Sequence, residues 1–61
     1  MKERWNPEDL YKVQFWNRER YIDVEVHAGN AKLAQTMAFG ALVRDGENGR
    51  NLSLISVTRI G

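Results

Sequence analysis

Two short segments in which apolar and polar side chains alternate constrain the fold of this chain more than any other feature. They span residues 10–16 and 21–27, and four polar residues separate them. Alternation with a period of two, in segments rich in β-branched and aromatic residues, is typical of half-buried strands, and the short polar break suits a hairpin. One face of this predicted antiparallel hairpin carries the apolar side chains Tyr11, Val13, Phe15, Ile22, Val24 and Val26.

The next segment has the composition of a helix. Asn30 is a favourable N-cap, residues 31–44 are rich in good helix formers, and Gly46 follows where helices commonly end. On a helical wheel, small or apolar residues form one stripe that would let the helix lie close against a sheet. This predicted stripe contains Ala34, Met37, Ala38 and Ala41, with Leu33 and Leu42 beside it.

Residues 52–60 predict a final strand. The pattern does not decide which face of this strand points toward the core. Leu52 and Leu54 are out of phase with Ile55 and Val57, and a β-bulge would explain the change. The predicted fold is α+β in the order β-β-α-β, with one helix packed on one face of a three-stranded, mainly antiparallel sheet. We expect residues 10–61 to form the single domain and residues 1–9 to form a tail or a short turn. The predicted core contains Val13, Phe15, Ile22, Val24, Val26, Met37, Ala41 and Val57.

The size of the chain implies a thin stability margin. It has 61 residues and no cysteine, so disulfides and thiolate metal sites are excluded, and its single histidine makes a structural zinc site implausible. Small folds without such cross-links often depend on association, and we therefore expect a homodimer or a partner. The N-terminal residues lack the apolar stretch of a secretory signal, and no apolar run is long enough to cross a membrane, so a cytoplasmic location is expected.

Few residues suggest chemistry. Asp23, Glu25 and His27 share one strand face and are suitable metal ligands, but acids that alternate with apolar residues are also typical of a solvent-exposed sheet face. The sequence offers no obvious third and fourth ligand, no glycine-rich phosphate loop and no base placed to activate a nucleophile. We expect no metal, no cofactor and no enzymatic activity.

Binding residues are easier to nominate. Aromatic and apolar side chains that fall off the predicted core face indicate a protein interface, unless the N-terminal tryptophan folds over them. These candidates are Phe39, Val43, Trp16, Trp5 and Tyr21. Alternatively, the hairpin aromatics could stack on bases while nearby arginines hold phosphates. The candidates for that nucleic-acid surface are Arg18, Arg20, Arg44 and Arg50, although a net charge of only +1 weighs against it.

Three segments of the chain together show a pattern shared with other small proteins. They are the alternating segment from Tyr21 to Val26, the alanine-rich helix after Asn30 and the segment from Ile55 to Ile60. In this pattern the chain resembles small β-β-α-β proteins encoded by bacteriophages and other mobile elements. The resemblance implies stand-alone proteins that block or redirect a larger host complex, anti-CRISPR proteins among them. The expected function is therefore a non-enzymatic protein-binding inhibitor or regulator, with a small nucleic-acid-binding regulator as the alternative.

Overall fold

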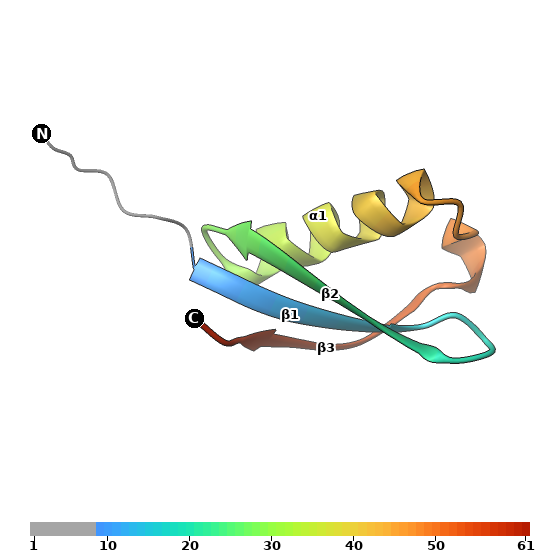
Figure 1. Ribbon diagram of the computed structural model, residues 1–61, viewed down its shortest axis with the longest axis horizontal. Coiled ribbons are helices and arrows are strands. Elements are labelled where there is room, and N and C mark those ends of the chain that lie inside the picture. The colour runs from blue at the N-terminus through green and yellow to red at the C-terminus, as the bar shows by residue number, and fades with distance from the viewer. Residues whose placement is uncertain (1–8) are drawn as a thin grey trace, which may run out of the picture.

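The computed structural model describes residues 9–61. The chain forms β1 (Asp9–Trp16), β2 (Tyr21–Ala28), α1 (Ala31–Arg44), a short 3₁₀ helix η1 (Gly49–Asn51) and β3 (Ser53–Arg59). The three strands form one antiparallel sheet in the order β2-β1-β3, and α1 crosses one of its faces (Figure 1). The predicted α+β fold is confirmed. Trp5 and almost all of the predicted tail or turn lie outside the described residues.

The hairpin forms as predicted, and its loop is organised by Asn17. β1 and β2 pair without interruption from Asp9 opposite Ala28 to Trp16 opposite Tyr21. The Asn17 side-chain oxygen accepts hydrogen bonds from the backbone N–H groups of Glu19 (2.9 Å) and Arg20 (2.8 Å). Asparagine commonly stabilises turns in this way. The loop therefore encloses only the four residues 17–20.

The last strand contains the β-bulge that its sequence suggested. Gln14 of β1 lies opposite Ser56 of β3, but the next residue, Phe15, lies opposite Leu54. Ile55 is the extra residue between them. The bulge changes the phase of β3, so that Leu54 and Val57 both lie opposite side chains of the β1 face that α1 covers.

The core is small and lies between α1 and the middle of the sheet. Its buried side chains are Tyr11, Val13, Phe15, Ala28, Ala34, Ala38 and Leu42. The predicted core residues Val13 and Phe15 are confirmed as buried, while Ile22, Val24, Val26 and Val57 are partly buried and pack against the core. Ala41 is also only partly buried.

The prediction that Met37 is buried is wrong, because its side chain is 40% exposed. The buried stripe of α1 consists of Ala34, Ala38 and Leu42, which are spaced four residues apart. Met37 lies about 100° around the helix from Ala38. The predicted stripe was therefore rotated away from the real one, toward Met37.

The ends of α1 follow the sequence signals. The Asn30 side chain accepts a hydrogen bond from the N–H of Leu33 (2.9 Å), which satisfies a free donor in the first turn. Gly46 has φ of 107°, a backbone conformation that favours glycine, and its N–H donates to the Val43 carbonyl (3.1 Å). Within residues 9–61 no helix is long and apolar enough to cross a membrane.

The helix does not cover the sheet evenly. α1 packs most extensively on β2 and less on β1 and β3. The β3 side of the covered face therefore keeps exposed apolar surface, with Leu54 41% exposed.

Candidate functional site

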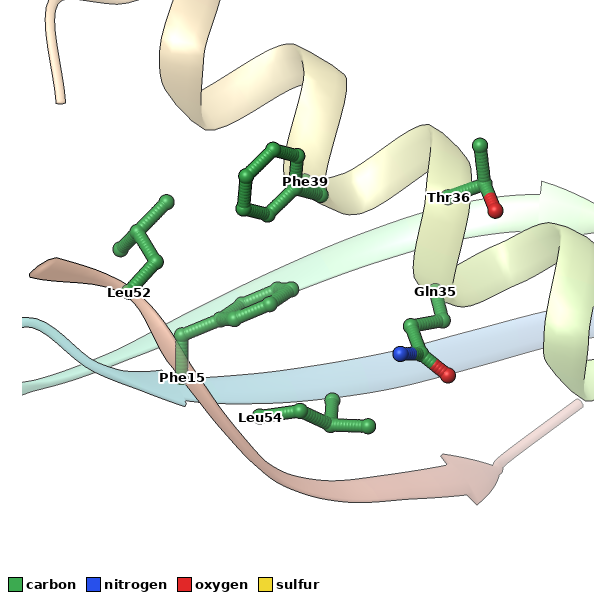
Figure 2. A pocket seen from close by; sticks show the side chains of 6 residues that line it. All are labelled: Phe15, Gln35, Thr36, Phe39, Leu52 and Leu54. Atoms are coloured by element: carbon green, nitrogen blue, oxygen red, sulfur yellow. The ribbon is translucent and has the colours of Figure 1, made fainter. Parts of the chain in front are cut away.

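A groove lies between α1 and β3, where the helix leaves the sheet partly uncovered. Its cavity has a volume of about 290 Å³. Figure 2 shows its side chains, which come from β1, α1 and the final segment of the chain. They are Phe15, Gln35, Thr36, Phe39, Leu52 and Leu54. None of these side chains is charged.

Local backbone features create this groove. The β-bulge at Ile55 places Leu54 opposite Phe15, on the side of the sheet that α1 covers. On the helix side, the tip of the Phe39 ring approaches Gly49, where a Cβ atom would lie 3.0 Å from Phe39 Cζ. The absence of a side chain at Gly49 therefore leaves room for the aromatic ring beside the groove.

Phe39 lies closer to the core than its predicted position. On the helical wheel Phe39 and Val43 fall off the predicted core face, and the sequence therefore placed them on the outer face of the helix. In the structure the Phe39 ring centroid is 6.2 Å from that of the buried Phe15, and Phe39 is 39% exposed. The stripe is centred on Ala38, so Phe39 lies on a flank of α1, about 100° away. The outer-face placement of Phe39 is therefore wrong, whereas its role in an interface stays a prediction.

Val43 occupies the same flank of α1, one turn further along. It is 43% exposed, and a Cβ atom at Gly49 would lie 3.5 Å from its Cγ2 atom. Phe39 and Val43 therefore lie against the connection between α1 and β3, and only part of each side chain is exposed to solvent. Leu54, across the groove from Phe39, is exposed to a similar degree (41%).

Two other predicted interface residues, Trp16 and Tyr21, lie on the face of the sheet that α1 does not cover. Trp16 and Tyr21 are paired at the end of the hairpin, with ring centroids 4.9 Å apart and an interplanar angle of 54°. Tyr21 is exposed and Trp16 is half-buried. The structure thus brings these two candidates together but separates them from Phe39 and Val43.

The four candidate arginines gather at one end of the molecule. Arg18 and Arg20 lie in the hairpin loop, whereas Arg44 ends α1 and Arg50 lies in η1. Figure 1 shows the hairpin loop and η1 at the same end, and the Asn17 side-chain amide donates to Glu47 Oε1 (3.3 Å) between them. Acidic residues are interspersed there, namely Glu19, Asp45 and Glu47. This end of the molecule is rich in arginine, but its net charge is only weakly positive.

The acidic strand face has the organisation of an ordinary sheet surface. Asp23 lies 3.8 Å from the Lys12 ammonium of the neighbouring strand, in an exposed ion pair. Within residues 9–61, no three His, Cys, Asp or Glu side chains come together as a group that could hold a metal ion.

No known family model matches this chain, and neither a curated protein nor a solved structure matches it significantly. Sequence reasoning missed Gln35, Thr36, Leu52 and Leu54 as lining residues of the groove. The break in phase between Leu54 and Ile55 was the signal that could have located it, because a bulge re-aims side chains.

Proposed function

We propose that this protein is a non-enzymatic binding protein that inhibits or regulates a larger protein complex. The resemblance to small phage and mobile-element proteins suggests a host complex as the target, and the proposal places this activity in the cytoplasm. The observation that carries the proposal is the uncharged groove between α1 and β3. It combines exposed aromatic and aliphatic side chains with a defined cavity, as binding surfaces on small proteins commonly do.

The groove suits an apolar side chain that projects from an uncharged segment of the partner. Its walls are two phenylalanine rings and two leucines, with the amide of Gln35 and the hydroxyl of Thr36 at the side. The Thr36 hydroxyl already donates to the Lys32 carbonyl (3.2 Å). A charged group placed there would lose hydration without meeting an opposite charge. An aromatic or aliphatic anchor would instead gain burial, which commonly dominates interface energies.

Changing Leu54 to glutamate is expected to abolish partner capture. The substitution places a carboxylate in the apolar groove. Losing a hot-spot residue costs about 2 kcal/mol or more, which is roughly a thirtyfold loss of affinity. Affinity capture with the tagged protein from a bacterial lysate, followed by titration of the purified partner, measures the effect.

The matched control is Leu33→Glu. Leu33 is 42% exposed, close to the 41% of Leu54, but it lies on the opposite flank of α1. The Leu33→Glu variant should still capture the partner. Both variants should keep the far-UV circular dichroism spectrum of the wild type. Equal capture by the two folded variants would show that the groove is not the docking surface.

Nucleic-acid binding is the second candidate, and the clustering of four arginines beside the Trp16–Tyr21 pair favours it. If all four arginines contact phosphates of a single strand, the logarithm of the binding constant should fall with the logarithm of salt concentration with a slope of about −3. Fluorescence anisotropy with a labelled single-stranded oligonucleotide measures this slope. Absence of binding at low salt would eliminate this candidate.

A further inference from the structure

The connection between α1 and β3 contains an asparagine that is followed directly by a glycine, Asn48 and Gly49 (Figure 1). In such a pair the backbone nitrogen of the glycine can attack the side-chain amide of the asparagine. Glycine favours this reaction because it has no side chain to shield its nitrogen and permits wide backbone rotation. Asn48 is exposed to solvent, and neither of the proposed binding surfaces uses its side chain.

The attacking group is available in the folded protein. Within residues 9–61 the N–H of Gly49 donates no hydrogen bond, so no bond to this group has to break before its nitrogen reacts. The other glycine of the connection differs, because the N–H of Gly46 donates to the Val43 carbonyl (3.1 Å). Gly49 therefore supplies an unengaged nucleophile next to an exposed amide.

The short helix η1 holds Asn48 out of the reactive geometry. Asn48 has an extended backbone with ψ of 113°, which keeps the Gly49 nitrogen turned away from the side-chain carbon Cγ. The Asn48 side-chain oxygen accepts a hydrogen bond from the N–H of Arg50 (3.0 Å), and its backbone carbonyl accepts one from the N–H of Asn51 (2.9 Å). Ring closure requires rotation about the Cα–C bond of Asn48, so these hydrogen bonds must open first.

Opening of η1 is expected to cost little free energy. The element has only three residues, Gly49–Asn51, and none of them is buried. Single 3₁₀ turns have poor hydrogen-bond geometry, and exposed segments with few buried contacts open locally far more often than the whole domain unfolds. The folded protein should therefore reach the reactive geometry by local opening.

We propose that Asn48 is a site of spontaneous deamidation whose rate is controlled by the opening of η1. The nitrogen of Gly49 attacks Cγ of Asn48, and a new C–N bond closes a five-membered succinimide ring. The Gly49 nitrogen gives up its proton, the bond from Cγ to the side-chain nitrogen breaks, and ammonia leaves. One water molecule then opens the ring. The overall reaction takes up water and releases ammonia, with no oxidation or reduction.

The ring can open in two ways, and the two products differ in structure. Water attack at Cγ gives aspartate, whose carboxylate can still accept the hydrogen bond from the N–H of Arg50. Water attack at the main-chain carbonyl gives isoaspartate, in which the chain runs through the side chain and is longer by one carbon. This product displaces Gly49, which fits closely against Phe39 and Val43. Isoaspartate should therefore weaken the connection, whereas aspartate should preserve it.

This inference goes beyond the proposed function and does not depend on it, because the reaction needs only the isolated protein and water. Peptide mapping by mass spectrometry measures it in the full chain, incubated in neutral and in mildly alkaline buffer. The peptide with Asn48 is expected to gain the mass difference between OH and NH₂. The gain should be faster at the higher pH, because the attacking nitrogen must lose its proton.

The chain offers internal controls in the same sample. Asn17, Asn30 and Asn51 are each followed by a residue that carries a side chain, and they should stay unconverted while Asn48 reacts. In urea, Asn48 should react faster than in the folded protein, because η1 no longer restrains it. The variant Asn48→Gln should not react on this timescale, since its ring would need six members.

Two results would overturn the proposal. One is a folded protein that keeps its Asn48 amide after the urea-unfolded chain has converted completely. The other is conversion of the remaining asparagines as fast as Asn48.

Thermal unfolding separates the two products. The isoaspartate product, identified by labelling with an isoaspartyl methyltransferase, should melt about 4 °C or more below the wild type. The matched variant Asn48→Asp carries the same charge on a normal backbone and should melt close to the wild type. An isoaspartate product as stable as Asn48→Asp would contradict the part assigned to η1.

Discussion

Replacing Phe15 by alanine is expected to lower the free energy of unfolding by about 3–5 kcal/mol, as large-to-small changes at buried aromatic positions do. A domain of 61 residues has a total stability of only about 3–9 kcal/mol by the usual scaling with length. The change therefore removes about half or more of the stability, and the variant should unfold at a much lower urea concentration than the wild type.

The position of Phe15 explains this effect. Its side chain is 2% exposed and is one of the two largest fully buried side chains of residues 9–61. It lies opposite Ile22 on one neighbouring strand and opposite Leu54 on the other, and its ring contacts Phe39 of α1. Alanine would leave a cavity that borders all of these elements. The same change would remove the floor of the groove.

Urea unfolding followed by circular dichroism measures the loss of stability. Leu33→Ala is the control, since this side chain is 42% exposed and its removal should change stability by no more than about 0.5 kcal/mol. A Phe15→Ala protein that unfolds at the same urea concentration as the control would contradict the position of Phe15 in the core.

The strands and helix were predictable because local signals agreed with one another. Alternation in β1 and β2, the short polar break between them and the cap Asn30 each act within a few residues of the chain. Even the irregularity of β3 was visible, because a bulge changes the phase of an alternating pattern.

The rotation of α1 was less predictable, and so was the groove. Met37 and Phe39 flank Ala38 at similar angles, so the wheel alone could not decide which flank is drawn toward the core. The decision comes from tertiary contacts, because α1 packs toward β2 and Phe39 contacts Phe15 above the bulged part of β3. The groove depends on this offset together with the absence of a side chain at Gly49. Neither feature has a local sequence signal.

Changing Ala38 to glutamate is the second large effect that we expect, with a loss on the order of 3–5 kcal/mol at neutral pH. Ala38 is fully buried at the centre of the helix stripe, where its methyl group faces the core. No buried side chain of the described residues is charged, so an introduced carboxylate would find no buried counter-ion. An unpaired buried ion costs several kcal/mol even after the structure relaxes, and the added volume strains the packing of α1 on the sheet.

The charge contribution can be separated from the volume contribution by pH. Burial raises the pKa of an introduced carboxyl group above its unfolded value of about 4.3, so the charge penalty is absent below that pH and grows as the pH rises. Ala38→Gln, a neutral side chain of similar size, shares only the volume penalty. The stability difference between the two variants, measured by urea unfolding, should therefore shrink as the pH falls toward 4. A difference that does not change with pH would mean that the carboxylate reaches solvent, and that α1 does not press Ala38 against the sheet.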